Sequence, residues 1–291
     1  MHRFLIPASP MNACRSLALT VALVALPAFA ADTPKPLRAL LITGGCCHEY
    51  GVQKDVLKSG IEARAHIVVD QVHSANTTGS PPLAIFRNPG YARGYDVVIH
   101  DECVGDLRDP AVFQGVLKPH LDGIPGVNLH CAMHSYRFGD YGQPVARGAE
   151  NAHWYEYIGL QSTGHGPHEP IAISFVNRDH PITRTLGDWT TVNEELYNNV
   201  QILDGKVLAT GKQVVKQSKR QPDGTMTEEA QTVEAAVVWT HEFGPKKTRV
   251  FSTSLGHHTA TVADARYLDL VTRGILWAAG KDDQPGYVKQ P

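Results

Sequence analysis

The stretch Leu37-Arg-Ala-Leu-Leu-Ile-Thr-Gly-Gly45 predicts the first strand of a buried parallel sheet. Its apolar run stops at Gly44 and Gly45, after which a polar loop leads into a helix-like segment at residues 52–63. Strands that read as almost continuous apolar runs are buried on both faces, which is typical of parallel sheets covered by helices.

The same alternation continues along the N-terminal half. Residues 66–72, 95–100 and 126–129 have the composition of strands, and residues 110–121 read as a helix. Asp109 suits the N-cap of that helix, since Pro110 then takes the first helical position. Strands alternating with helices indicate an α/β fold with helices on both faces of the sheet.

Beyond residue 170 the pattern changes to strands joined by turns, several of them antiparallel. The expected strands are residues 171–177, 188–193, 201–210, 231–241 and 248–254. Residues 212–229 are polar, with Pro222-Asp223-Gly224 near the middle, and predict an exposed hairpin tip. A last amphipathic helix at residues 263–279 ends at Gly280. We therefore expect an antiparallel β extension in the C-terminal half.

Composition points to an ordinary globular protein with a small ligand. The 291 residues are 42% hydrophobic and 19% charged, and 27 basic residues against 29 acidic ones leave a net charge of -2. This balance favours neither nucleic acid nor an anionic membrane as a partner. A small neutral or weakly charged molecule fits better.

Residues 1–30 have the pattern of a signal peptide. A basic residue, Arg15, precedes the apolar run 17–26, and small Ala28 and Ala30 precede an expected cut at Ala31. The run is shorter than the ~20 residues that span a bilayer. We expect an exported protein, periplasmic or extracellular, with one mature domain at residues 31–291 and no stable membrane insertion after cleavage.

Removal of this segment leaves four cysteines, namely Cys46, Cys47, Cys103 and Cys131. Exported compartments permit disulfides. Neighbouring Cys46 and Cys47 are poorly placed to bond each other, whereas either can bridge to Cys103 or Cys131 if the strand ends approach. A chain of this length buries a sizeable core without disulfides, so we expect buried free thiols.

Histidine is abundant, with 15 in the chain, and several stand where a predicted strand ends. In open α/β sheets the loops at the carboxyl ends of the strands form the ligand crevice. We expect four distant histidines to converge there: His48, His130, His165 and His257. Catalytic Zn²⁺ takes about three protein ligands and keeps a position for water, so these four are candidate ligands of a divalent metal, with zinc preferred.

Other polar residues are expected to have structural or solvent-exposed positions. His66, His73, His100, His120, His153 and His241 are interpreted as structural. His168 and His258 are interpreted as solvent-facing neighbours, and Asp101 and Glu102 as solvated loop acids.

The order of short motifs resembles the ThuA-like, or trehalose-utilisation, proteins over residues 37–280. The matching pieces include Gly44 followed by His48, a strand ending in His130, Trp154-Tyr-Glu-Tyr-Ile-Gly159 leading to His165, and Leu255-Gly256-His257. The resemblance implies a flavodoxin-like α/β fold related to class I glutamine amidotransferases, and a role in disaccharide and oxidised-sugar catabolism. In amidotransferases a strand-turn-helix elbow presents a cysteine. Here His130 occupies the elbow, with Cys131 beside it.

These patterns define candidate roles for a second set of residues. His130, Glu195 and Cys131 are the candidate catalytic residues. His134 follows His130 by four positions, so their side chains share a face if a helix begins there. The candidate substrate-binding residues are His134, Tyr136, Trp154 and Tyr197, although a core position is the default for each aromatic ring.

The leading hypothesis is a hydrolase or lyase acting on a glycoside or keto-sugar. Oxidation to a keto-sugar acidifies the neighbouring C–H, so Glu195 or His48 could move a proton while a metal or His130 polarises the carbonyl. An acid-base pocket without metal explains the histidines equally well. The alternatives are a non-catalytic carbohydrate-binding or scaffold module, and an amidotransferase-like hydrolase that uses Cys131.

Overall fold

The computed structural model describes residues 1–2, 34–105, 107 and 109–289, and residues 34–289 lie within one compact unit. The expected signal peptide, residues 1–30, lies outside the described residues apart from its first two. Strand β1 (Leu37–Gly45) is buried at every position except Arg38, and it pairs in parallel with β2 (Ile67–Ser74) and β3 (Val97–Cys103). The opening apolar run is therefore an interior strand of the sheet.

One sheet of nine strands runs through the described residues in the order β2-β1-β3-β4-β11-β10-β9-β6-β7. Strands β4 (Gly126–Leu129) and β11 (Thr248–Thr253) continue the parallel pairing, which makes the order of the first five strands flavodoxin-like. The remaining strands pair antiparallel: β10 (Met226–Phe243), β9 (Lys206–Arg220), β6 (His165–Phe175) and β7 (Trp189–Tyr197). Two-residue strands β5 (Leu160–Gln161) and β8 (Gln201–Ile202) pair separately. The predicted fold class, including its antiparallel extension, is confirmed.

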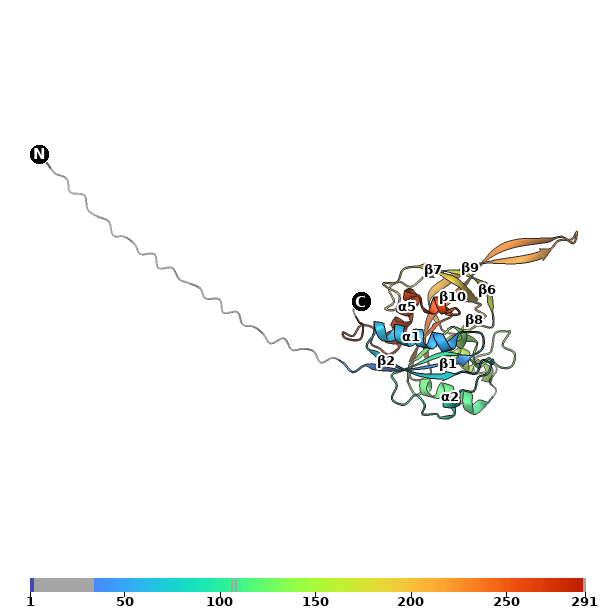
Figure 1. Ribbon diagram of the computed structural model, residues 1–291, viewed down its shortest axis with the longest axis horizontal. Helices are drawn as coiled ribbons and strands as arrows, with labels where there is room; N and C mark the ends of the chain where they lie inside the picture. Colours follow the sequence, from blue (N-terminus) through green and yellow to red (C-terminus); the bar gives the residue numbers. More distant parts are fainter. Residues whose placement is uncertain (3–33, 106, 108, 290–291) are drawn as a thin grey trace. The chain divides into compact units, whose positions relative to one another are not determined.

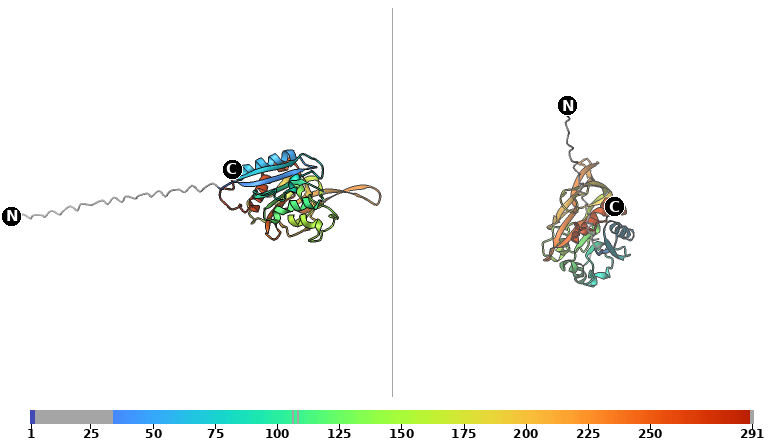
Figure 2. Two further views of the ribbon diagram at one scale, coloured as in Figure 1. Left: turned by 90° about the horizontal axis from the view of Figure 1, so that it is seen from below. Right: turned by 90° about the vertical axis from the view of Figure 1, so that its left-hand side faces the viewer.

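Helices cover both faces of the sheet. Alternate side chains of β1 point to opposite faces: Leu41 packs with α1 (Tyr50–Arg64) and α5 (Ala265–Ala278), and Leu40 with α2 (Pro110–Leu121) and α3 (His153–Ile158). Figure 2 shows α1 and α2 on opposite sides of the strands. Shorter helical turns complete the layers: η1 (Ala84–Arg87), η2 (His130–His134), η3 (Glu150–Ala152) and α4 (Thr259–Val262).

Local signals in the sequence account for several boundaries. Helix α2 has the predicted bounds, and the Asp109 side chain accepts the N–H of Ala111 as an N-cap. Helix α5 is followed by Gly280 at φ +67°. Strands β9 and β10 form the predicted exposed hairpin, which extends beyond the body of the sheet in Figure 1. Among the described helices, none is both long and apolar enough to cross a membrane.

A buried polar network lies between β3 and α2, on one face of the sheet. His100 Nδ1 lies 2.8 Å from a Glu102 oxygen, His100 Nε2 lies 3.0 Å from His120 Nε2, and the Tyr136 hydroxyl donates to Glu102. All four side chains are buried. The structural interpretation of His100 and His120 is therefore confirmed. The interpretation of Asp101 and Glu102 as solvated acids is wrong, because β3 extends through both and buries them.

Burial of His120 predicts a pH-dependent stability. Burial lowers the pKa of His120 to about 3, and the neighbouring His100 adds to this effect. In the unfolded chain His120 binds a proton below about pH 6.5, whereas in the folded chain it stays neutral down to about pH 3. The free energy of unfolding therefore falls as the pH drops from about 6.5 towards 3. In His120→Gln that slope should be shallower by up to ~1.4 kcal/mol per pH unit. Urea unfolding at several pH values between 7 and 4 measures the slope of the free energy of unfolding against pH.

The control for this measurement is His153→Gln, which alters a half-buried side chain and should keep the wild-type slope. Equal slopes in wild type and His120→Gln would contradict the prediction.

Candidate functional site

A tight turn at the end of β1 brings His48 over the sheet edge. Gly45 has φ +118°, and a Cβ there would lie 2.3 Å from the backbone oxygen of Cys103. A larger residue would clash with β3, so only glycine lets the chain turn this closely. The ring of His48 lies 4.7 Å from those of His130 and His257, measured between centroids.

His130 stands between β4 and η2 in the left-handed region, at φ +41°. A non-glycine residue held there is strained, and such strain often marks functional positions. Its Nδ1 donates to the carbonyl of Ser254 at 2.7 Å, so Nε2 is the atom that faces the site. Nε2 lies 3.1 Å from the Tyr197 hydroxyl and 3.4 Å from a Glu195 oxygen. The elbow predicted at His130 is therefore present.

The segment after β11 is held by a carboxylate that the sequence analysis missed. Glu194, fully buried, accepts the backbone N–H groups of Gly256, His257 and His258 at 3.4, 3.1 and 3.1 Å. Gln53 of α1 also donates to the carbonyl of His257 at 2.9 Å. Two separate elements thus position the His257 ring.

Glu195 lies at the centre of the site. One of its oxygens is 2.8 Å from Nε2 of His168 and 3.4 Å from Nε2 of His165, and the other is 3.2 Å from Nδ1 of His257. With His130, four imidazoles surround one carboxylate. Burial alone would raise the pKa of Glu195, but hydrogen bonds and charge from His130 and His257 outweigh burial and hold it well below its ordinary value.

Three of the four predicted metal ligands converge, and one stands apart. Nitrogens of His48, His130 and His257 all lie within 4.8 Å of one another. Burial lowers the pKa of His48 to about 2, with His130 and His257 adding to it, and its buried Nδ1 has no hydrogen-bond partner among the described residues. His165 contacts Glu195 at the exposed rim instead.

His168 and His258 belong to the site, although the sequence analysis treated them as neighbours of it. Nitrogens of His168, His257 and His258 form a second group within 4.8 Å. The His168 side chain is 44% exposed, as expected of a solvent-facing residue, but it also contacts Glu195. The alternation of side chains between the two faces of β6 could have indicated the position of His168 from the sequence. A register shift between His165 and His168 interrupts that alternation.

The predicted substrate-binding residues lie behind the site or in the core. Tyr136 and Trp154 are 2% and 1% exposed, and Trp154 donates to the carbonyl of Ala132, so the prediction that they stack on a ligand is wrong. His134 is buried and contacts Ser162 at 2.8 Å. Its ring stacks on Tyr197 at 4.0 Å, and Tyr197 in turn contacts His130. His134 therefore supports Tyr197 and His130 from behind.

The cysteines are paired in a way the sequence analysis did not expect. Cys46 bonds Cys47, and Cys103 bonds Cys131 across the ends of β3 and β4, where their Cα atoms are 5.1 Å apart. The expectations of free thiols and of bridges from Cys46 or Cys47 to the other pair are both wrong. A disulfide sulfur offers no thiolate, so Cys131 is not the nucleophile in this structure.

A cavity opens beside the exposed rim of the site, at the base of the β9–β10 hairpin. It measures about 390 Å³, and its lining includes His165, Gly166, Tyr197 and Asn198. This volume falls within the range of small-molecule pockets. The fold and site together define a flavodoxin-like α/β protein with a histidine-rich polar site at the carboxyl edge of its parallel strands.

Residues 39–278 match the ThuA family, described as trehalose utilisation, and the chain belongs to that family. A ThuA-like protein of known structure from Parabacteroides merdae is 21% identical, with a TM-score of 0.57 over 88% of this chain and 93% of its own. One from Bacteroides uniformis is 18% identical, with a TM-score of 0.56 over 87% and 96%. Both share the fold. No curated protein matches the sequence.

Removal of the Glu194 carboxylate should loosen the segment that carries His257. In Glu194→Ala three backbone N–H groups lose their acceptor in a buried place, and we expect the free energy of unfolding to fall by about 3 kcal/mol. Glu194→Gln keeps one acceptor oxygen and should lose less. Urea unfolding measures both, with exposed Glu242→Ala as the control. An unchanged stability in Glu194→Ala would refute the assigned role.

Proposed function

We propose that this chain is an exported enzyme of carbohydrate catabolism that breaks a glycosidic bond in a glycoside oxidised to a keto-sugar. The ThuA family's description as trehalose utilisation supports the substrate class. The pattern of residues 1–30 supports export to the periplasm or the extracellular space. The observation that carries the proposal is the Glu195 carboxylate surrounded by His130, His165, His168 and His257.

A single carboxylate suits elimination better than ordinary glycoside hydrolysis. Glycosidases pair two carboxylates across the scissile bond. Here Glu194 is occupied by three backbone N–H groups, so only Glu195 meets the imidazoles. A keto-glycoside needs no second carboxylate, because its carbonyl makes the adjacent C–H acidic enough for one base to remove the proton.

The reaction proceeds by proton removal and loss of the leaving group. Glu195 accepts the proton from the carbon beside the carbonyl; Nδ1 of His48 can take this role only when it holds no cation. The electron pair of that C–H bond forms a C=C bond as the glycosidic C–O bond breaks. The leaving oxygen takes a proton from a solvent-accessible imidazole, for which half-exposed His165 and His168 are placed at the rim. His130 polarises the carbonyl oxygen, and water addition to the C=C bond completes a net hydrolysis.

The imidazoles also suit a divalent cation, with zinc preferred. Zn²⁺ takes imidazole nitrogens and carboxylate oxygens. Three imidazole nitrogens lie within 4.8 Å of one another here, beside the Glu195 carboxylate, and Nδ1 of His48 has no hydrogen-bond partner among the residues that the structure describes. His48, His130 and His257 would hold the ion, with Glu195 beside them. When bound, such an ion supplies a Lewis acid for the carbonyl oxygen.

A non-catalytic carbohydrate-binding or scaffold module is the second candidate. The buried positions of Tyr136 and Trp154 favour neither role, whereas the strained backbone of His130 favours catalysis, since a binding module has less need of it. Turnover decides between the two.

Zinc binding tests the donor set. The mature protein should bind about one Zn²⁺ by calorimetry and elemental analysis, and His130→Ala and His257→Ala should each weaken binding at least tenfold, which is about 1.4 kcal/mol. His66→Ala is the matched control, because His66 contacts the Pro34 carbonyl away from the site. This donor set would be ruled out if the wild-type protein bound no zinc, or if both variants bound zinc as tightly as the wild type.

Turnover tests the reaction. The mature protein should cleave keto-glycosides and leave the unoxidised glycosides intact, while Glu195→Gln and His130→Ala should lose at least a hundredfold in kcat/KM. His66→Ala should keep full activity. The rate is obtained from the amount of alcohol released, which chromatography quantifies. Saturable sugar binding without turnover of any keto-glycoside would establish the binding module instead.

A further inference from the structure

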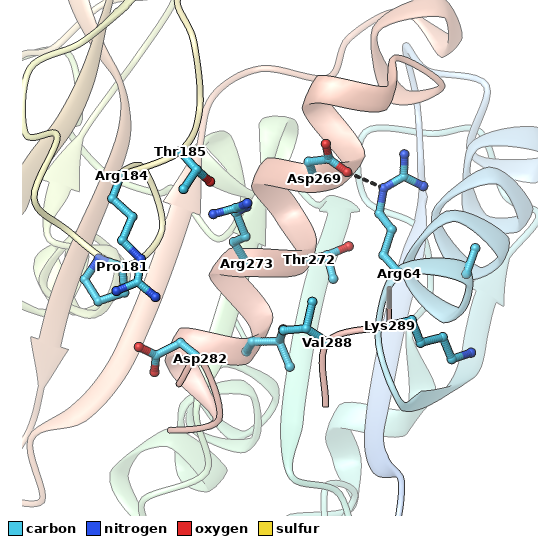
Figure 3. Close-up of a pocket in the computed structure, with 12 residues that line it drawn as sticks. Arg64, Pro181, Arg184, Thr185, Asp269, Thr272, Arg273, Asp282, Val288 and Lys289 are labelled. Atoms are coloured by element: carbon cyan, nitrogen blue, oxygen red, sulfur yellow. Dashed lines mark hydrogen bonds and ion pairs between the residues drawn. The ribbon is translucent and has the colours of Figure 1, made fainter. Parts of the chain in front are cut away.

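A cavity of about 730 Å³ lies far from the histidine site, between the carboxyl end of α1, the side of α5, residues 181–185 and the C-terminal residues 282–289. Figure 3 shows the side chains that converge on it. The two sites lie near opposite ends of α1, whose 15 residues span roughly 20 Å. The cavity is therefore a separate place on the molecule with its own chemistry.

Positive charge dominates the lining. Four basic side chains, Arg64, Arg184, Arg273 and Lys289, face two acidic ones, Asp269 and Asp282. Asp269 is already paired with Arg64 at 2.6 Å. The remaining carboxylate, Asp282, lies 3.9 Å from Arg249. An excess of positive charge is left around Arg184 and Arg273.

Arg273 is a partly buried cation in a part of the chain where the described residues offer it no partner. Its side chain makes no hydrogen bond or ion pair with any described residue, and neither does the side chain of Arg184. Burial lowers the pKa of Arg273 from its ordinary value; Asp269 opposes this effect and Arg184 reinforces it. A guanidinium stays charged under any physiological condition, so its burial beside a second guanidinium costs free energy unless an anion joins them.

We infer that this cavity binds a small organic oxyanion, whose carboxylate or phosphate group is held by Arg184 and Arg273. Guanidinium groups bind both kinds of anion through paired N–H donors. The rest of the ligand lies against the apolar part of the lining, formed by Ala63, Pro181, Leu276 and Val288. A cavity of this size accommodates a single sugar ring or a molecule of similar bulk.

Calorimetry on the mature protein tests the site with three probes: glucuronate, glucose 6-phosphate and inorganic phosphate. We expect saturable binding of one equivalent for at least one organic anion, tighter than for inorganic phosphate and weakened by salt. Preference for glucuronate assigns a carboxylate, and preference for glucose 6-phosphate a phosphate. Inorganic phosphate binding as tightly as both would overturn the organic part of the inference.

Variants locate the binding on these residues. Arg273→Gln should weaken binding of the preferred anion at least tenfold. Arg184→Gln, at an exposed side chain, keeps the test valid if Arg273→Gln does not fold. The control is Arg178→Gln, which removes a surface arginine paired with Asp188 outside the cavity.

Two results would overturn the inference. One is the absence of saturable binding for every probe at millimolar concentration. The other is undiminished binding in Arg184→Gln and Arg273→Gln. Because His130→Ala alters only the distant site, it should bind the anion as the wild type does, which keeps this test separate from that of the proposed enzyme.

Discussion

Two consecutive carboxylates at the end of β7 hold the histidine site together. Adjacent residues of a strand point in opposite directions. Glu194 therefore reaches the backbone of Gly256, His257 and His258, while Glu195 reaches the imidazoles of His130, His165, His168 and His257. One residue fixes the segment that carries a histidine, and the next supplies the negative charge that several histidines share.

The charge balance of this site depends on Glu195 and the imidazoles around it. A buried carboxylate is costly unless opposite charge or hydrogen-bond donors surround it. Nδ1 of His130 donates to a backbone carbonyl, so the opposite nitrogen faces Glu195 and the Tyr197 hydroxyl. Either a proton or a cation between Nε2 and the carboxylate makes this contact favourable. The same arrangement therefore suits proton transfer and metal binding, and it accounts for the two chemistries that the sequence left open.

Much of the fold could be predicted from the sequence because its signals are local. The apolar run of β1, the Asp109-Pro110 start of α2 and the Gly280 end of α5 each depend on neighbouring residues. The convergence of His48, His130 and His257 could be predicted too, since parallel strands end at one edge of a sheet. Pairings between distant residues could not be predicted from the sequence. The length of β3, which buries Asp101 and Glu102, and the bond between Cys103 and Cys131 depend on packing that no local pattern contains.

The antiparallel extension decides what the flavodoxin-like half can do. The five parallel strands bring His48, His130 and His257 to one edge, but the acceptor at their centre comes from β7 and the rim from β6. Without the extension, three imidazoles would meet with no carboxylate among them, and the segment at His257 would lose the Glu194 contacts. Since β6 and β7 reach the site only because the sheet continues past β11, the extension is part of the site itself. Changes in the length or register of β6 and β7 would therefore alter the chemistry as directly as changes in the histidines.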